Sequence, residues 1–201
     1  MTQVCLKELI IGAKSGHLVS FPTDTVPALA ALPNQAELIF AAKQRRADKP
    51  LILMAASPED LWPYVTGTPE EIKIWQQVAR TYWPGPLTLV LPASAAVPKA
   101  MNPSNPTTLG IRVPKCELAC QILAETGPMA TTSANLSGQP PLRSMAEIDT
   151  AFPEVLTLQN TEVKSGSGLP STVAKWMDRG WHILRQGSVN LASSASQPMP
   201  F

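Results

Sequence analysis

The sequence has little charge of either sign and few aromatic residues. Charged residues make up 15% of its 201 residues and aromatic residues 5%, and the formal net charge at pH 7 is +1. A strongly basic nucleic-acid-binding surface is therefore not expected from the totals, although a local basic patch is compatible with them. Hydrophobic residues make up 44%, so the chain has enough apolar side chains for a packed core and does not have the composition of a disordered protein.

Several common forms of catalytic chemistry lack their residues here. His17 and His182 are the only histidines, and neither stands in a metal-binding spacing. The chain has no GxSxG elbow, no GxxxxGK[ST] loop and no GxGxxG fingerprint. This argues against a covalent nucleophile, a tightly held transition metal and a nicotinamide cofactor. An enzyme with this sequence has to act by placing its reactants and stabilising charge.

The sequence also lacks the segments that direct proteins out of the cytoplasm. No run is long and apolar enough to span a bilayer, and residues 1–16 lack the uninterrupted apolar stretch of a signal peptide. The three cysteines form no CxxC pair; Cys116 and Cys120 lie four apart on a predicted helix. We expect a cytoplasmic protein with reduced thiols and no disulfide scaffold.

Proline is abundant and marks the ends of apolar segments. The chain has 21 prolines, about twice the usual share. Proline at these positions ends strands and stiffens loops, which suits a preorganised small-molecule site, although simple punctuation explains any single proline equally well. Strands are predicted at residues 18–21, 51–55, 87–91, 108–113, 129–132, 155–158, 171–176 and 181–184. Helices are predicted at residues 6–13, 34–43 with Asn34 as N-cap, 68–82, 116–125 and 145–151, with a short helix capped by Ser57.

The irregular alternation of these elements predicts an α/β protein with a mixed sheet. No linker divides the chain, so we expect one domain over residues 1–189. Residues 190–201 are rich in Ser, Ala and Pro and are expected to form a disordered tail.

Polar segments follow or join the predicted strands, where open α/β sheets usually bind ligands. The Pro-Thr-Asp-Thr turn at residues 22–25 offers two hydroxyls and a carboxylate, but by itself it favours a simple turn with Asp24 bonded to local amides. The loop TTSANLSG at residues 131–138 is long enough to favour contact with a phosphate or a base. Ser171 and Arg185 repeat the pattern at later strand ends.

Cationic side chains supply the second pattern. Residues 43–49 hold Lys43, Arg45, Arg46 and Lys49 at a predicted helix end. Cations are favourable at any helix C-terminus, but their density here favours binding of an anion such as a triphosphate. Arg112 lies inside an apolar strand and needs either a protein carboxylate or a ligand anion; the sequence does not choose between them.

These segments, taken in order, resemble the YrdC-like family of threonylcarbamoyl-adenylate synthases. The family's markers are PTDTVYGL, KxR followed by PL, WPGPLT, GxRxP, TSANxSG, STV and LRxG. This chain has PTDTVPAL, KQRRADKPL, WPGPLT, LGIRVP, TTSANLSG, PSTV and LRQG between Phe21 and Gly187. The resemblance implies an open twisted mixed sheet with flanking helices around a deep basic cavity, in the family's short form without the C-terminal extension.

The resemblance also implies the reaction. L-Threonine and bicarbonate form an N-carboxy-threonine, which attacks the α-phosphorus of ATP and releases pyrophosphate, leaving threonylcarbamoyl-AMP. A partner tRNA-modifying transferase complex then transfers the threonylcarbamoyl group to tRNA adenosine, and weak tRNA binding is compatible with this role. Magnesium is expected to accompany ATP, with no tightly bound metal held by the protein.

The family's functional residues carry over by position. Threonine binding falls on Thr25, Arg112, Thr131 and Ser171, and ATP binding falls on Arg45, Lys49, Thr108, Ser133 and Arg185. The KxR and SxN sets make Lys43, Arg45, Ser133 and Asn135 the expected catalytic group at the phosphates.

Departures from the family pattern concentrate around the expected threonine site. Pro27 and Ala28 replace Tyr-Gly, Met54 stands where many relatives place histidine, and Lys175 stands where aspartate often follows STV. Lys49 replaces a frequent asparagine. An alternative is therefore a YrdC-like paralogue that carbamoylates another amine, or one that is an RNA- or nucleotide-binding module. The few aromatic residues and low net charge argue against a strong RNA surface.

Overall fold

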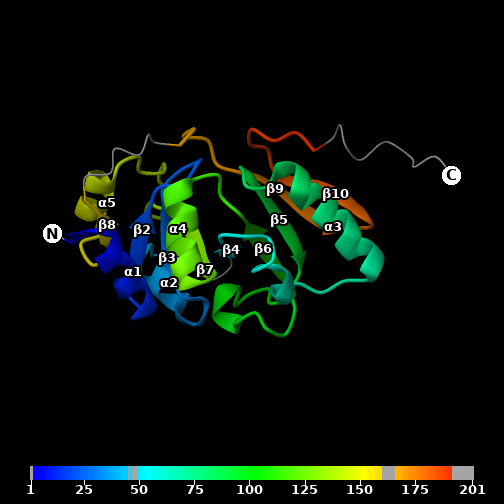
Figure 1. The fold of residues 1–201 in the computed structure, drawn as a ribbon, viewed down its shortest axis with the longest axis horizontal. Coiled ribbons are helices and arrows are strands. Elements are labelled where there is room, and N and C mark those ends of the chain that lie inside the picture. The colour runs from blue at the N-terminus through cyan, green and yellow to red at the C-terminus, as the bar shows by residue number, and fades with distance from the viewer. Residues whose placement is uncertain (1, 45, 47–48, 160–165, 192–201) are drawn as a thin grey trace.

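The computed structural model describes residues 2–44, 46, 49–159 and 166–191, which form one continuous mixed sheet with helices packed on it (Figure 1). The strands are, in chain order, β1 (Gln3–Val4), β2 (Val19–Phe21), β3 (Ala28–Ala31), β4 (Ile52–Met54), β5 (Leu87–Pro92), β6 (Thr108–Arg112), β7 (Met129–Ser133), β8 (Leu156–Leu158), β9 (Thr172–Met177) and β10 (Gly180–Arg185). Their order in this ten-stranded sheet is β1-β8-β2-β3-β7-β4-β6-β5-β9-β10. The expected α/β class with an open mixed sheet is confirmed.

The sheet is mixed because it contains both parallel and antiparallel pairs of neighbouring strands. Strands β4 and β6 are parallel, as are β5 and β9, whereas β7 is antiparallel to both β3 and β4. Strands β2 and β3 are buried along their whole length. These two strands therefore belong to the core of the protein, together with buried residues of the other strands and the helices.

Five α-helices lie against the described part of the sheet. They are α1 (Leu6–Lys14), α2 (Glu37–Ala42), α3 (Pro69–Tyr82), α4 (Glu117–Thr126) and α5 (Met145–Ala151), with short 3₁₀ turns at Pro33–Gln35, Trp62–Tyr64 and Lys99–Met101. Helices α1 and α4 pack on each other, and α1 also contacts β2 and β8. Helix α3 lies at the opposite end, beside β9 and β10 (Figure 1). No helix of the described residues is long and apolar enough to cross a membrane.

Helix α3 shows how local sequence fixes an element. Thr68 accepts a hydrogen bond from the backbone of Glu71, whose side chain accepts one from the Thr68 backbone, and Pro69 occupies the first turn. Trp75 is fully buried on the inner face and meets Trp176 of β9 edge to face at 6.2 Å. Trp176 also donates from Nε1 to the Glu71 carboxylate over 2.9 Å. The helix is thus started by its own sequence and fixed in place by β9.

The structure corrects three predictions about elements. Asn34 lies in a 3₁₀ turn rather than capping a helix, because α2 begins only at Glu37 with Ala36 as its N-cap. Ser57 donates to the Asp60 carboxylate over 2.8 Å in a turn and caps no helix; the nearby 3₁₀ turn begins at Trp62. The sequence pattern missed β1 and also β3, whose Ala-Leu-Ala-Ala sequence has weak strand propensity and is a strand because it is paired on both sides.

The ends and thiols of the described chain also bear on the predictions. Leu191 is 2% exposed, so the packed part of the chain continues through this residue; residues 192–201 of the expected tail lie outside the described residues. Cys5, Cys116 and Cys120 are free thiols, as expected.

Candidate functional site

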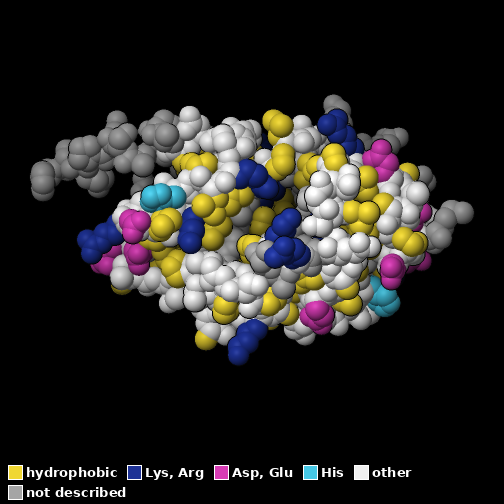
Figure 2. Space-filling model, turned by 180° about the vertical axis from the view of Figure 1, so that it is seen from behind, with side chains coloured by type: hydrophobic (Ala, Val, Ile, Leu, Met, Phe, Trp, Pro, Cys, Tyr) yellow, Lys and Arg dark blue, Asp and Glu magenta, His cyan; other side chains and the backbone are white. Residues whose placement is uncertain are grey.

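A cavity of about 530 Å³ opens against strands β4, β5, β6, β7 and β9. Figure 2 shows the hollow from behind the view of Figure 1, with Lys and Arg side chains at its rim and the acidic side chains of that face lying away from it. Polar and charged residues that line it are Thr25, Lys49, Thr88, Asn102, Asn105, Thr108, Arg112, Thr131, Thr132, Ser133, Ser171, Lys175 and Arg185. Expected site residues from six separate segments thus share one hollow.

Strand register explains which residues reach this cavity. Thr108, Gly110 and Arg112 alternate along β6 and all line it, as do Ser171, Val173 and Lys175 along the start of β9. Across the sheet, Gly110 lies opposite Ile52 on β4 and Val90 on β5. One face of each strand therefore forms the cavity wall while the other face packs into the core.

Arg112 lies at one end of the cavity and is fixed by three contacts. Its Nη2 donates to Asp24 Oδ1 over 2.6 Å, its Nη1 to Thr25 Oγ1 over 2.9 Å, and its Nε to the carbonyl of Gly85 over 3.1 Å. The side chain is 3% exposed. The choice that the sequence left open is resolved: Arg112 pairs with a carboxylate of the protein, while it also lines the cavity.

Burial and neighbouring charges act on Arg112 in opposite directions. Loss of solvent lowers the pKa of Arg112, Asp24 raises it through its charge and hydrogen bond, and the charge of Arg185 lowers it. Asp24 is thus the group that compensates the buried guanidinium. The carboxylate predicted as part of a simple turn contributes to the site through Arg112.

The turn at residues 22–25 is held from the outside by a glycine segment. Ser167 and Gly168 donate their amides to the carbonyls of Asp24 and Thr25, each over 2.9 Å. A Cβ on Gly166 would lie 2.4 Å from the carbonyl oxygen of Thr23, so only glycine permits this close approach. From Gly166 onward, this segment is therefore fixed to the turn by hydrogen bonds.

Ser171 and Arg185 form a second fixed group beside Arg112. Arg185 donates from Nε to the carbonyl of Ser171 over 3.0 Å and from Nη2 to its Oγ over 3.2 Å, and Thr88 Oγ1 lies 2.8 Å from the same Oγ. Partial burial lowers the pKa of Arg185. Gly187 makes the approach possible, because its Cβ would lie 2.5 Å from the carbonyl oxygen of Pro170. The predicted Ser171 and Arg185 are therefore positioned by each other.

The expected catalytic group is brought together only in part. Ser133 lines the cavity and donates from Oγ to Asn135 Oδ1 over 2.6 Å. Lys43 is 1% exposed; its Nζ donates to the Ser133 carbonyl and, over 3.2 Å, to Asn135 Oδ1. Lys43 and Asn135 thus lie behind Ser133 rather than in the cavity lining. Arg45 lies outside the described residues.

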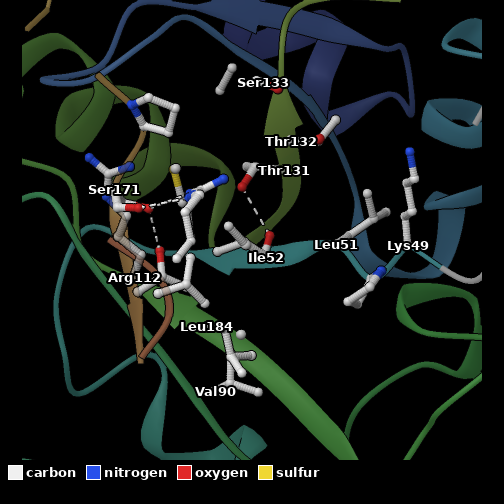
Figure 3. A pocket seen from close by; sticks show the side chains of 18 of the residues that line it. Lys49, Leu51, Ile52, Val90, Arg112, Thr131, Thr132, Ser133, Ser171 and Leu184 are labelled. Carbon is white, nitrogen blue, oxygen red and sulfur yellow. Dashed lines mark hydrogen bonds between the residues drawn. The ribbon is translucent and has the colours of Figure 1, made fainter. Parts of the chain in front are cut away.

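The other expected binding residues occupy different parts of the cavity (Figure 3). Thr131 lines it, but its Oγ1 donates to the carbonyl of Ile52 over 2.9 Å within the sheet. Lys49 lies at the far side from Arg112 and Ser171. Thr108 lines the start of β6, where its carbonyl accepts from Asn102 Nδ2 over 3.1 Å.

Sequence reasoning missed several lining residues. Thr88, Asn102 and Asn105 lie in or beside the predicted strands but were assigned no role, and Thr132 was included only as part of the predicted ligand loop. Alternation along 87–91 could have placed Thr88 and Val90 on one face; nothing in the sequence indicated that Asn102 folds back to the start of β6. The five departures from the family pattern, Pro27, Ala28, Lys49, Met54 and Lys175, all line the cavity.

The cavity lining has an apolar part and a cationic part, and together they limit which ligands fit. Leu51, Ile52, Val90 and Leu184 give it an apolar part, to which Gly110 adds no side chain. Among the described lining residues there are four cations, Lys49, Arg112, Lys175 and Arg185, and no Asp or Glu. No group of three or more His, Cys, Asp or Glu among the described residues could hold a metal ion. The arrangement suits a polyanion with an apolar portion.

The chain is similar to proteins of one known family. The sequence model of the Sua5/YciO/YrdC family, described as "Telomere recombination", matches residues 13–187. Threonylcarbamoyl-AMP synthase of Pyrococcus abyssi is 36% identical over 89% of this chain and 52% of its own length. The synthase of Vibrio cholerae O1 is 34% identical over 90% of this chain and 97% of its own length.

Solved structures agree with the sequence relatives. The P. abyssi Sua5 structure complexed with L-threonine matches with a TM-score of 0.81 at 34% identity, covering 95% of this chain and 57% of that protein. Escherichia coli YciO matches with a TM-score of 0.78, covering 93% of this chain and 91% of that protein, and at 22% identity it shows the fold alone. This chain spans about half the length of the P. abyssi relative. The shared sequence and fold, extending through every segment that lines the cavity, show that this chain belongs to the Sua5/YciO/YrdC family.

Proposed function

We propose that this protein is a threonylcarbamoyl-AMP synthase, a nucleotidyltransferase that uses L-threonine, bicarbonate and ATP. The observation that carries the proposal is the single cavity in which Thr25, Arg112, Ser133, Ser171 and Arg185 meet. Relatives that carry this name match the chain along most of its length, and the Sua5 of P. abyssi has been crystallised with L-threonine. The comparisons support this enzyme rather than a module that only binds RNA.

The proposed mechanism needs no nucleophile from the protein. The threonine amine attacks the carbon of bicarbonate and forms a carbamate with loss of water. A carbamate oxygen then attacks the α-phosphorus of ATP as the bond to pyrophosphate breaks. The protein has to align the two reactants and offset the charge that develops on the phosphates.

Two groups of residues have proposed parts in this reaction. Arg112, Thr25, Thr131 and Ser171 are proposed to bind threonine; its carboxylate is the group that suits the Arg112 end. Arg185, Lys49, Thr108 and Ser133 are proposed to bind ATP, with Arg45 joining them and Lys43 and Asn135 holding Ser133 in place. ATP is proposed to enter with magnesium, and the described lining residues supply no carboxylate that would hold the ion.

The product belongs to tRNA modification in this proposal. Threonylcarbamoyl-AMP is a mixed anhydride that a tRNA-modifying transferase complex in the cytoplasm would consume, with weak tRNA contact at the basic rim. This part rests on the family alone.

The direct test is release of pyrophosphate from ATP by the purified protein. Release is expected to depend on both threonine and bicarbonate, and a screen of other amino acids in the same assay identifies a different amine if there is one. Arg185→Ala is expected to lower turnover at least about ten- to hundredfold and leave the fold intact, because a charge-assisted contact to a phosphate is worth about 1.5–3 kcal/mol and the Ser171 contact is lost as well.

The matched control is Arg80→Ala, which removes the same charge from the exposed face of α3. It is expected to retain the wild-type rate. Pyrophosphate release that is independent of threonine would contradict the proposed function, and wild-type turnover in Arg185→Ala would remove Arg185 from the site.

A further inference from the structure

Lys175, on β9, lines the same cavity as Gly110 of β6. In the sheet it lies opposite Val90 on β5, which in turn lies opposite Gly110 on β6. Neighbouring strands are about 4.8 Å apart, and Gly110 carries no side chain that would occupy the space above the sheet. The flexible four-carbon stem of lysine is therefore long enough to bring its ammonium over Val90 into the cavity that Lys175 lines.

The other fixed cations of this wall already have partners. Arg112 is paired with Asp24 and uses Nε, Nη1 and Nη2 in hydrogen bonds. Arg185 is bonded twice to Ser171. Lys175, in contrast, makes no hydrogen bond and no ion pair with any residue of the described ranges, and the described lining around it contains no carboxylate.

The charges favour an anionic ligand at Lys175 over a role as a solvated surface lysine. The residue is half-buried in a strand whose neighbours Ala174 and Trp176 are packed in the core, so the strand is held firmly at the wall. An ammonium in a concave site that already contains Arg112 and Arg185 is repelled by both of these cations. A bound anion between them attracts all three side chains and offsets this repulsion. The carboxylate of the amino acid is matched by Arg112, which leaves the phosphates of the nucleotide.

We propose that Lys175 binds a phosphate group of the nucleotide and so sets the affinity of the cavity for ATP. The inference rests on the proposed function insofar as the nucleotide is ATP. The residue acts by direct electrostatic contact with the phosphate, which persists through attack at the α-phosphorus.

The experiment measures binding of ATP, ADP, AMP and adenosine by calorimetry to the wild-type protein and to Lys175→Met. The methionine side chain keeps the length of lysine and removes its charge. ATP binding is expected to weaken about ten- to hundredfold, the range that corresponds to loss of one charge-assisted hydrogen bond, while adenosine binding stays unchanged. Comparing ATP, ADP and AMP then identifies the phosphate, since the loss disappears with the first analogue that lacks it.

Two further variants distinguish direct contact between Lys175 and the phosphate from a general effect of the protein's net charge. Lys73→Met removes an equal charge from the exposed side of α3 and is expected to bind ATP as the wild type does. Lys175→Arg keeps a cation at the wall and is expected to restore most of the affinity. Equal ATP affinity in Lys175→Met and Lys73→Met would overturn the proposal, and so would an equal loss of adenosine binding or a change confined to the KM for threonine.

The same measurements distinguish failure of the inference from failure of the proposed function. A wild-type protein that binds ATP more tightly than adenosine through Lys175, but releases no pyrophosphate with threonine and bicarbonate, contradicts the synthase and supports the phosphate contact. A synthase with normal turnover whose Lys175→Met variant binds ATP normally contradicts the phosphate contact alone.

Discussion

Arg112 and Asp24 form the buried ion pair on which one end of the cavity depends. The two side chains are 3% and 12% exposed and lie 2.6 Å apart. A buried pair of this kind adds little net stability, but removing one partner leaves an uncompensated charge in the interior. The pair therefore fixes the geometry of the site, and its loss is costly.

Asp24→Ala is predicted to lower the free energy of unfolding by about 3–5 kcal/mol, because Arg112 then remains buried without a carboxylate. Urea unfolding measures the change. The double variant Asp24→Ala/Arg112→Met is predicted to be more stable than Asp24→Ala, since no buried charge is left unpaired. Glu59→Ala, which removes an exposed carboxylate, serves as the control. A loss below about 1 kcal/mol in Asp24→Ala would show that water or a rearrangement compensates Arg112.

At the scale of elements, α3 depends on a single carboxylate at its first turn. Glu71 accepts the backbone N–H of Thr68 over 2.9 Å and the Nε1–H of Trp176 over 2.9 Å. The Thr68 backbone is the larger cause of the lowered pKa of Glu71, and Trp176 adds to it. The carboxylate thus links the start of the helix to β9, the strand that carries Lys175 into the cavity.

The sign of this pKa shift predicts a dependence of stability on pH. A carboxyl group whose pKa is lower in the folded state stabilises the fold above its unfolded pKa of 4.5 and stops doing so as the pH falls through its folded value. Glu71→Gln is therefore predicted to be less stable than the wild type at pH 7, with a difference that shrinks below pH 4.5. Thermal unfolding between pH 3 and pH 7 measures it. Glu70→Gln, in the same turn and exposed, is expected to show a smaller pH-dependent difference.

At the scale of the whole molecule, one sheet connects the two ends of the protein. Strands β1 and β8 stand at one end and β9 and β10 at the other, joined by hydrogen-bonded neighbours throughout (Figure 1). The cavity lies across the middle strands, so its shape depends on the register of all of them. Because no strand of this sheet is separated from the rest, the protein is expected to unfold as a unit.

Urea unfolding is predicted to show one cooperative transition with the same midpoint by two probes. The five tryptophans lie in or beside α3, β9, β10 and the 3₁₀ turn at Trp62, so fluorescence reports on that end of the sheet. Far-ultraviolet circular dichroism also reports on α1, α4 and α5 at the other end. Separate midpoints would show that the two ends unfold independently and would contradict a single domain.

The sequence alone was sufficient wherever the information is local. Thr68-Pro69-Glu70-Glu71 starts α3, and the motifs from Phe21 to Gly187 identify the family because seven of them occur in order. Helix α5 and the strands at residues 87–91 and 108–113 were predicted within one or two residues, since their apolar periodicity is clear. The same motifs named eight residues that line the cavity: Thr25, Lys49, Thr108, Arg112, Thr131, Ser133, Ser171 and Arg185.

Only the tertiary structure decided how these residues are paired and which of them face the cavity. Asp24 belongs to Arg112, 88 residues away, and Lys43 supports Ser133 from behind rather than lining the cavity. Strand β3 exists because β2 and β7 pair with it, and Thr88 and Lys175 reach the cavity because of the register of β5 and β9. Pairing across a sheet depends on contacts between residues far apart in the chain, which local propensity does not encode.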